Sequence, residues 1–344
     1  MRIVQIMLGK EFGGAERSFI DLCAALSMRG HEVLAICESR AQARAYVERI
    51  DGITVRPIKV FGPWDYWAAL QLKSHIKAFK PSIVQAHLAR AAKLGGWAAR
   101  SLSIPSVAKT HNYVNLKYYR RINHLVPTTD KQRKYLLANG VTEDKISQIA
   151  NFSSIAPMPR AQAQAGDPLR VVALGRLVHK KGFDVLLRAV AAAVQSGADI
   201  RLEIAGDGPE LTVLKNQVAE LDLVSKVTFL GWQASPESVL ARADVFVLPS
   251  RDEPFGIVCL EAMALGVSII ATRTDGPAEI LDGDTALLVD IEDVSGLAQA
   301  LVEIASDPAK AAARAAAARD KFNASYSEEI VLQQYLELYR RLVC

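Results

Sequence analysis

Cysteine is scarce in this chain, and no two cysteines have the CxxC spacing of a zinc or redox site. The four cysteines lie far apart, at Cys23, Cys37, Cys259 and Cys344. No apolar run approaches the ~18 to 20 residues that span a bilayer. The N-terminus starts with a strand-like run and lacks the basic head and apolar centre of a signal peptide. These absences predict a protein of the reducing cytoplasm with no disulfide or metal framework.

The chain also lacks the phosphate-binding motifs G-x-G-x-x-G and G-x-x-x-x-G-K-[ST]. Instead, Gly9 ends the first strand-like run, and Gly13-Gly14 stands directly before a predicted helix. Glycines at such a place let backbone amides approach an anion closely. The alternative is that Gly13 and Gly14 form an ordinary tight turn.

The formal net charge of +4 conceals a strong asymmetry. Residues 1–165 contain 24 Lys+Arg and 11 Asp+Glu, whereas residues 166–344 contain 17 and 26. A basic half indicates an anionic partner, such as nucleic acid, a membrane surface or a phosphorylated substrate. The alternative is that the two halves attract each other across a cleft. No known nucleic-acid-binding module is present, so we expect no nucleic-acid partner.

Short apolar strands and helical segments alternate along the first half, as is typical of a parallel, doubly wound sheet. The predicted strands are residues 2–8, 31–37, 54–60, 82–87, 106–111, 124–128 and 146–150. The predicted helices are residues 15–28, 41–49, 66–79, 90–102 and 131–139.

The alternation breaks at residues 153–168, which contain three prolines and no period, and then restarts. The later strands are predicted at 169–177, 200–206, 226–232, 245–250, 268–272 and 286–290, with helices at 183–195, 209–221, 236–242 and 257–265 and a helical tail from Val294. We therefore predict an α/β protein with two Rossmann-like doubly wound domains, residues 1–160 and 161–325, facing across a cleft. Ligands of such sheets bind outside the carboxyl ends of the strands.

Two segments of the second half combine charge with strand-to-helix turns. Arg176 and Lys181 follow the first strand there and suit a diphosphate, although a solvated basic loop is the alternative. Glu253 and Glu261 flank the turn Pro254–Gly256, so up to about 12 Å of helix axis separates them. That separation exceeds the roughly 5 to 10 Å of a glycosidase carboxylate pair. It matches the distance from the sugar to the ribose in a nucleotide sugar. The alternative is that both glutamates are simply exposed residues of a helix.

Histidines offer a weaker signal. His87 and His111 end successive strands, where ligands are expected, but no metal-ligand spacing such as HxxxH is present. The sequence Asp282-Gly283-Asp284 has the DxD form of a metal site, yet it falls between a helix and a strand, where a plain turn is the commoner structure. We predict no metal site.

Several motifs together resemble glycosyltransferase family 4, whose members are retaining enzymes with the GT-B fold. The matching segments, in chain order, are GGAERSFIDLCAALSMRGHEV, IVQAHLARAAKLGGWAARSLSIPSVAKTHNY, ALGRLVHKKGFDVLLRAV, IAGDGPE and EPFGIVCLEAMALGVSIIAT. The resemblance implies that residues 326–344 form a helix that crosses back and packs on the N-terminal domain. It also implies retention of configuration, no required cofactor or metal, and a nucleotide-sugar donor, with uridine diphosphate (UDP) the commonest carrier. The chain departs from the family at Asp275-Gly276, where Gly-Gly is usual.

The resemblance assigns roles to matching residues. The implied catalytic residues are Glu253, His87, Arg176 and Lys181, and the implied donor-binding residues are Gly14, Arg176, Lys181, Gly206, Glu253, Phe255, Gly256, Ile257 and Glu261. The implied acceptor-side residues are Gly13 and His111, which we extend by Lys117, Arg120 and Arg121. These role assignments predict transfer of a sugar to a glycan or phosphorylated lipid-linked acceptor in cell-surface polysaccharide or lipopolysaccharide synthesis. The alternatives are a GT-B nucleotide-sugar epimerase and a non-catalytic protein that binds a membrane surface.

Residues 109–134 are basic and rich in tyrosine. They contain Lys109, Lys117, Arg120, Arg121, Lys131, Arg133 and Lys134, interleaved with Tyr113, Tyr118 and Tyr119. Such a surface fits an anionic lipid or a phosphorylated acceptor, because basic residues bind anionic headgroups and aromatic rings suit the interface. We expect a peripheral enzyme on the cytoplasmic face of the inner membrane. The alternative is a solvated helix that faces the acidic half.

Overall fold

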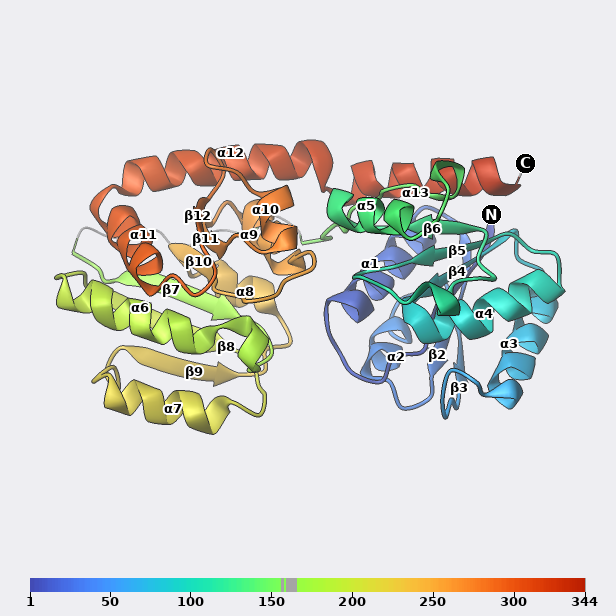
Figure 1. The fold of residues 1–344 in the computed structure, drawn as a ribbon, viewed down its shortest axis with the longest axis horizontal. Helices are drawn as coiled ribbons and strands as arrows, with labels where there is room; N and C mark the ends of the chain where they lie inside the picture. The colour runs from blue at the N-terminus through green and yellow to red at the C-terminus, as the bar shows by residue number, and fades with distance from the viewer. Residues whose placement is uncertain (156–157, 159–165, 344) are drawn as a thin grey trace. The chain divides into compact units, whose positions relative to one another are not determined.

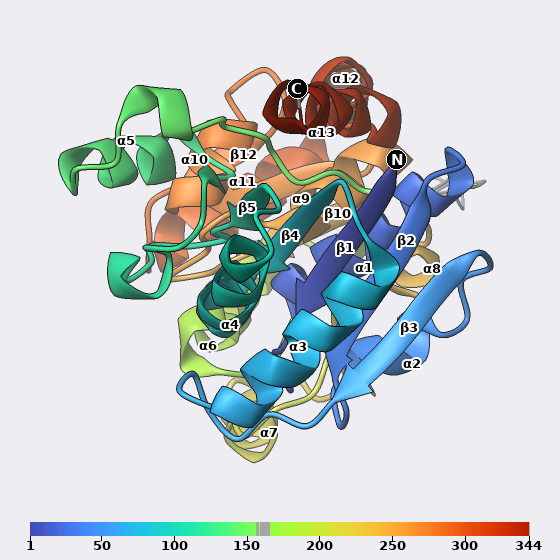
Figure 2. The same cartoon turned by 90° about the vertical axis from the view of Figure 1, so that its right-hand side faces the viewer.

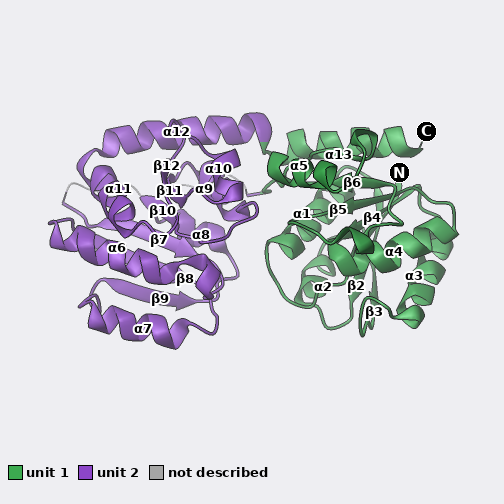
Figure 3. Ribbon diagram, viewed as in Figure 1, with its two compact units in different colours: residues 1–154, 326–344 green, residues 155–325 purple. Residues whose placement is uncertain are grey.

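The computed structural model describes residues 1–155, 158 and 166–343. The chain forms two compact units, coloured separately in Figure 3. Unit 1 comprises Met1–Ser154 and Tyr326–Cys344, and unit 2 comprises Ile155–Ser325. The predicted boundary between residues 160 and 161 lies outside the described residues.

Unit 1 is built on a six-stranded sheet in the order β3-β2-β1-β4-β5-β6, with every pair of neighbouring strands parallel (Figures 1 and 2). The strands are β1 (Arg2–Met7), β2 (Glu32–Glu38), β3 (Ile53–Ile58), β4 (Ile83–His87), β5 (Ser106–Lys109) and β6 (His124–Val126). Their Ile- and Val-rich sequences fit a sheet that is covered on both faces.

The predicted strand at residues 146–150 is wrong. Ile146 makes only an isolated bridge to Leu125, although Ser147 and Ile149 donate backbone hydrogen bonds to Leu125 and Pro127. Proline has no N–H, so Pro127 cannot donate the return bond of a parallel ladder. The segment therefore runs beside β6 without becoming a strand.

Two apolar cores cover the two faces of this sheet. The helices of unit 1 are α1 (Gly14–Met28), α2 (Gln42–Val47), α3 (Tyr66–Phe79), α4 (Leu88–Ser101), α5 (Asp130–Ala138) and α13 (Glu328–Val343), with short 3₁₀ helices η1 (Leu116–Tyr118) and η2 (Glu143–Lys145). Helices α1, α2 and α13 pack on the face that carries Ile3, whereas α3 and α4 pack on the face that carries Val4. Figure 2 shows α3 in front of the sheet.

The last helix belongs to unit 1, as the resemblance implied. Tyr335 and Tyr339 of α13 are fully buried in the core that α1 shares with the sheet. The tail is not one helix, however, because α11 (Val294–Ser306), α12 (Pro308–Ser325) and α13 are separate. Pro308 separates the first two, since a proline fits the first turn of a helix and not its interior.

Unit 2 has a second six-stranded parallel sheet, in the order β12-β11-β10-β7-β8-β9. Its strands are β7 (Leu169–Leu174), β8 (Ile200–Ala205), β9 (Val227–Gly231), β10 (Val245–Leu248), β11 (Ser268–Thr272) and β12 (Leu287–Val289). The remaining helices are η3 (His179–Lys181), α6 (Phe183–Gln195), α7 (Leu211–Glu220), α8 (Pro236–Leu240), α9 (Ile257–Leu265) and α10 (Asp275–Ile280). Sequence patterns missed α10, because Gly276-Pro277 suggests a turn, yet Pro277 lies in the first helical turn.

Both sheets have a point at which the strand order reverses. In unit 1 this point lies between β1 and β4, and in unit 2 it lies between β7 and β10. Loops that leave adjacent strands in opposite directions diverge there and leave room for a ligand. The functional side chains should therefore follow these four strands, each pair within its own unit.

Candidate active site

The reversal point of unit 2 brings together two of the predicted site residues. Lys181 ends η3 in the connection between β7 and α6, and Glu253 lies in the loop between β10 and α9. The Lys181 ammonium donates a hydrogen bond to the Glu253 carboxylate and forms an ion pair with it. Their side chains are 19% and 12% exposed, so the pair is sheltered yet reachable from solvent.

Close backbone packing joins these two loops. Gly182 has φ 66°, and a Cβ there would clash with the Pro249 carbonyl oxygen. The Arg251 amide donates to the Lys180 carbonyl oxygen at 2.8 Å, and the Arg251 guanidinium donates to both carboxylate oxygens of Asp184, at 2.7 and 2.8 Å. This framework fixes the spacing between the Lys181 and Glu253 backbones.

The loop after β8 approaches the same edge. Gly206 has φ 141°, and a Cβ there would clash with the Gly175 carbonyl oxygen. The Leu177 amide donates to the Asp207 carbonyl oxygen at 2.9 Å. Gly206 thus lets two loops pack backbone to backbone next to Arg176, whose side chain is exposed.

The start of α9 supplies a further part of this edge. Gly256 is the N-cap with φ 87°, and Ile257 is the first helical residue, so the first backbone amides of α9 follow Glu253 closely. Phe255 is buried, and Gly276 packs so tightly on its backbone that a Cβ there would clash. Glu261 lies on α9 and is only 5% exposed. The predicted donor residues 253–261 therefore form one continuous loop and helix.

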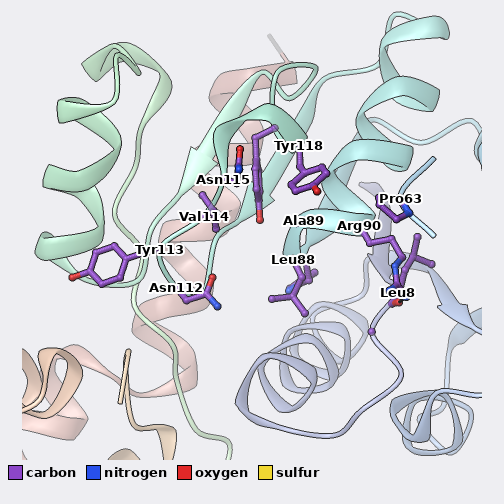
Figure 4. Close-up of a pocket in the computed structure, with 13 residues that line it drawn as sticks. Leu8, Pro63, Leu88, Ala89, Arg90, Asn112, Tyr113, Val114, Asn115 and Tyr118 are labelled. Carbon is purple, nitrogen blue, oxygen red and sulfur yellow. Dashed lines mark hydrogen bonds between the residues drawn. The ribbon is translucent and has the colours of Figure 1, made fainter. Parts of the chain in front are cut away.

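Unit 1 has a pocket of about 410 Å³ at its own reversal point (Figure 4). It is lined by the segments that follow four strands: Leu8 and Gly9, Pro63, residues 87–90, and residues 112–115 with Tyr118 and Tyr119. Arg90 and Leu8 lie together on one side, where the Arg90 guanidinium donates to the Leu8 carbonyl oxygen at 2.9 Å, and Tyr113 lies on the opposite side. The volume suits a sugar-sized ligand.

The two predicted histidines are adjacent in the structure. His87 ends β4 and lines the pocket, and its Nδ1 lies 3.1 Å from Nε2 of His111. The predicted strand 106–111 is too long, since β5 ends at Lys109 and His111 has φ 60°. Burial lowers the pKa of each histidine well below its ordinary value, and the Lys109 ammonium lowers both further. Both rings are therefore neutral at pH 7.

The Gly13-Gly14 turn has a neighbour that sequence patterns missed. Glu16, in the first turn of α1, is buried, and burial raises the pKa of its carboxyl group while backbone N–H bonds, including that of Gly13, oppose the rise. A Cβ at Gly9 would clash with this carboxylate. The signal was the acidic residue in the first turn of the predicted helix, where a capping carboxylate is common.

The predicted DxD sequence is a turn. Asp282 accepts backbone hydrogen bonds from Asp284 and Thr285 at 3.2 and 3.1 Å, and its carboxylate pairs with Lys321 at 2.7 Å. Among the described residues, no cluster of three or more His, Cys, Asp or Glu side chains could hold a metal ion.

Family comparisons match this architecture over most of the chain. Residues 12–156 match the model described as Glycosyltransferase Family 4, and residues 155–321 match the one described as Glycosyl transferases group 1. The lipopolysaccharide core biosynthesis glycosyltransferase LpsD of Rhizobium meliloti (strain 1021) is 32% identical over 346 aligned residues, which cover 99% of this chain and 98% of LpsD.

The chain belongs to glycosyltransferase family 4. LpsE of the same organism, also a lipopolysaccharide core biosynthesis glycosyltransferase, is 30% identical, with 98% of each chain covered. The crystal structure of Anabaena HepE in complex with UDP superposes with a TM-score of 0.85 over 99% of this chain and all of HepE, at 20% identity. The predicted GT-B fold and glycosyltransferase activity are thus confirmed. Within the described part of this glycosyltransferase, no helix has the length and apolar character to cross a membrane.

The structure corrects the basic surface that was predicted for residues 109–134. Lys109 and Tyr119 are buried, and Arg133 and Lys134 form ion pairs with Asp130, so these residues do not form a free cationic surface. Lys117, Arg120 and Arg121 are exposed, and they lie in and after η1 and not on a long helix. The Lys109 ammonium donates to Ser18 Oγ at 3.1 Å and to the Ala150 carbonyl oxygen at 3.5 Å.

Lys109 makes the stability of this glycosyltransferase depend on pH. Burial lowers the pKa of Lys109 to about 7, and Asp21 opposes that shift. The unfolded chain, with a lysine pKa of about 10.4, binds more protons than the folded chain between pH 7 and 10, so stability rises with pH in this window. We expect the melting temperature of Lys109→Met to rise less between pH 6.5 and 9 than that of the wild type. Each kcal/mol of unfolding free energy that no longer depends on pH should reduce this rise by roughly 2 to 4 °C.

Thermal melts at several pH values would check this expectation. Exposed Lys77 provides the control, because Lys77→Met should keep the wild-type pH dependence. An unchanged rise in the Lys109→Met variant would show that folding does not lower the pKa of Lys109.

Proposed function

We propose that this glycosyltransferase moves a sugar from a UDP-sugar donor to a glycan or lipid-linked acceptor during lipopolysaccharide or other cell-surface polysaccharide synthesis, with retention of configuration. The Lys181–Glu253 pair at the reversal point of unit 2 carries this proposal, because it places a cation and a carboxylate where a nucleotide sugar needs them. The lipopolysaccharide function of LpsD and LpsE and the UDP bound to HepE support it.

The donor would be held by the carboxyl edge of unit 2. Arg176 and Lys181 would bind the diphosphate and offset the charge that grows on it as the sugar–phosphate bond breaks. Glu253 and the first amides of α9, at Gly256 and Ile257, would bind the sugar end. Glu261 would bind the ribose hydroxyls, and the Gly206 turn would allow the backbone to approach the nucleotide.

The acceptor would occupy the pocket of unit 1. His87 lines that pocket and His111 supports it, while Gly13 caps the start of α1 at the same sheet edge. In the proposed reaction, the acceptor hydroxyl oxygen bonds to the sugar carbon on the face that the phosphate oxygen leaves. The leaving phosphate takes the hydroxyl proton, so no enzymic nucleophile is needed.

A panel of nucleotide sugars tests the donor assignment. We expect UDP-sugars to raise the melting temperature of the wild type, since a ligand at 100 times its Kd stabilises by about 2.7 kcal/mol. The same UDP-sugars should be hydrolysed slowly without an acceptor. Stabilisation by GDP-sugars alone would contradict the UDP assignment, and release of an epimerised sugar without transfer would favour an epimerase.

We also propose that the reaction needs no metal ion, because Arg176 and Lys181 can supply the positive charge that a metal would bring to the diphosphate. We expect sugar transfer to proceed at an unchanged rate after treatment with EDTA. The measurement is initial rate with and without the chelator, and recovery by added Mg²⁺ or Mn²⁺ after a complete loss would contradict the proposal.

Finally, we propose that unit 1 attaches peripherally to an anionic membrane. Its docking surface comprises the exposed aromatic residues Phe61, Trp64, Tyr66 and Trp67 and the basic residues Lys59, Lys73, Lys93, Lys117, Arg120 and Arg121. Trp64 and Trp67 are 78% and 75% exposed, which is unusual for tryptophan on a protein surface that contacts only water. Sequence patterns missed these rings, although the run FGPWDYW was their signal.

Cations and rings alternate across this docking surface. The Lys93 ammonium lies over the Trp64 ring and 5.6 Å from the Tyr118 ring centroid, and Lys117 lies 4.9 Å from the same Tyr118 ring. Desolvation lowers the pKa of Lys93, and the positive charges of Arg121 and Lys117 lower it further, as expected for neighbouring cations. Lipid headgroups with negative charge would relieve this repulsion.

Anionic groups are nearly absent from this stretch of sequence. Residues 52–129 contain twelve Lys+Arg and one acidic residue, Asp65. The Asp65 carboxylate is occupied in capping α3, since it accepts the amides of Ala68 and Phe61 at 3.0 Å each. Charge complementarity therefore favours an anionic partner, and the exposed rings favour a lipid interface.

A further inference from the structure

Five buried polar side chains of unit 1 form a continuous hydrogen-bonded chain next to the pocket. This His–Gln–Tyr chain consists of His111, His87, Gln5, Tyr339 and Gln85. It links the segment after β5, the strands β4 and β1, and the C-terminal helix α13. Four of its members are fully buried, and His111 is 9% exposed.

The carboxamide orientations of Gln85 and Gln5 fix the direction of the hydrogen bonds at Tyr339, because a hydroxyl group can donate as well as accept. Its hydroxyl group donates to Gln85 Oε1 at 2.5 Å and accepts from Gln5 Nε2 at 3.2 Å. With its Nε2 turned to Tyr339, Gln5 presents Oε1 to His87 Nε2 at 2.9 Å. A carboxamide oxygen only accepts, so His87 Nε2 must carry the ring proton.

The remaining protons then follow. A neutral His87 with a proton on Nε2 has a bare Nδ1, which accepts from the Nε2–H of His111 at 3.1 Å. His111 is neutral as well, since burial holds its pKa well below the ordinary value. Its own Nδ1 is therefore bare, and it has no hydrogen-bond partner among the described residues. Gln85 Nε2 can only donate, so its 3.3 Å contact with a protonated His87 Nε2 is not a hydrogen bond, and the shorter 2.9 Å contact with Gln5 Oε1 decides the assignment.

The backbone around the pair is held in unusual conformations. His111 has φ 60° in a three-residue turn, in which the Asn112 amide donates to the Thr110 carbonyl oxygen at 2.8 Å. Leu88, directly after His87, has φ 67°. Non-glycine residues rarely adopt this region, and such strain persists where the surroundings fix it, often at functional sites. Leu88 lines the pocket, and His111 directly precedes Asn112, which also lines it.

We propose that Tyr339 is a positioning residue that acts through Gln5 and His87 to hold His111 with an unprotonated Nδ1, ready to accept a hydrogen bond from a hydroxyl group of the acceptor sugar. This proposal rests on the proposed function, because it needs the acceptor to occupy the pocket of unit 1. It gives the returning C-terminal helix a part in substrate positioning in addition to packing.

Nitrogen NMR of protein labelled with ¹⁵N-histidine tests the proton positions directly, without substrate. The chain has six histidines, and His87→Gln and His111→Gln variants assign the two relevant spectra. At pH 7, wild type should show protonated Nε2 and bare Nδ1 for both residues. A protonated Nδ1 on either histidine would overturn the proposal.

The matched pair Tyr339→Phe and Tyr335→Phe tests the link to activity. Both tyrosines are fully buried on α13, but the Tyr335 hydroxyl makes no hydrogen bond of good geometry among the described residues, although Gln85 lies close enough to lower its pKa. We expect Tyr339→Phe to introduce the Nδ1-protonated form of His87 and to lower kcat roughly tenfold, about the effect of one hydrogen bond, with little change in the donor KM. Tyr335→Phe should keep the wild-type spectrum and stay within about twofold in kcat.

The outcomes separate this proposal from the proposed function. A wild-type protein that transfers no sugar would refute the proposed function, while its histidine spectrum would still decide the proton positions. An active Tyr339→Phe variant with wild-type kcat and spectrum would refute the positioning role alone.

Discussion

Replacement of Glu253 by Gln, or of Lys181 by Ala, should each lower the rate of sugar transfer by several orders of magnitude, about 10³-fold, while both variants remain folded. Glutamine keeps the size of Glu253 but removes the charge that pairs with Lys181. Alanine at position 181 removes the ammonium group that would face the departing diphosphate. Each change therefore affects a group whose interaction strengthens in the transition state, and such groups control kcat.

The measurement is initial rate at saturating donor, with circular dichroism and thermal melts on the same samples. Unit 2 offers matched controls in two other ion pairs, Glu203 with Arg242 at 3.2 Å and Lys226 with Asp199 at 3.0 Å. Glu203→Gln and Lys226→Ala make the same chemical changes away from the two loops, so both should retain most of the activity. Near-normal turnover by folded Glu253→Gln and Lys181→Ala variants would refute the site.

Sequence patterns were sufficient for both sheets, because each buried strand is a short Ile- and Val-rich run with a helical segment after it. They failed where a distant residue decides the outcome. Pro127, which cannot donate a return bond, stops the segment at 146–150 from becoming a strand. A strand prediction made segment by segment does not include the hydrogen-bonding capacity of the neighbouring strand.

Lys109 shows the same limit for side chains. It follows Val107 by two residues, so both side chains face the same side of β5. That side is covered by α1 and by Tyr335 of α13, whose ring centroid lies 5.2 Å from the Lys109 ammonium. More than 200 residues separate Lys109 from that helix, so the local sequence around Lys109 resembles an exposed basic segment.

The candidate site was partly accessible from sequence for a related reason. Ligand-binding residues of these folds follow particular strands, and His87, Lys181 and Glu253 do follow the strands at the reversal points. The sequence did not indicate that Lys181 and Glu253 form an ion pair across 72 positions, nor that Tyr339 completes the hydrogen bonds of His87. Those contacts depend on strand order, which determines which loops become neighbours.

The exposed rings of the docking surface would bind a membrane through a different interaction from its charges. Lysine and arginine attract anionic headgroups through a field that salt screens within about 10 Å at 0.1 M. Tryptophan at the headgroup level contributes through apolar contact, which salt does not weaken. The two contributions can therefore be separated by measuring binding at low and high ionic strength.

Charge reversal of Lys117, Arg120 and Arg121 to Glu should lower binding to anionic vesicles at least about a hundredfold, because each basic residue near such a surface contributes about 1 kcal/mol. Sedimentation with phosphatidylglycerol-containing vesicles, and with neutral vesicles as reference, measures this effect. Reversal of exposed Arg201, Lys215 and Arg319 in unit 2 changes the net charge equally and should leave binding intact. Hydrolysis of the UDP-sugar should be unchanged in both triple variants, since neither touches the Lys181–Glu253 pair.

The variant with Trp64 and Trp67 both replaced by Ala should lose the part of the binding that persists at high salt. If wild type ignores anionic vesicles at low salt, the membrane proposal fails, and the basic residues are left with a soluble phosphorylated acceptor as their partner.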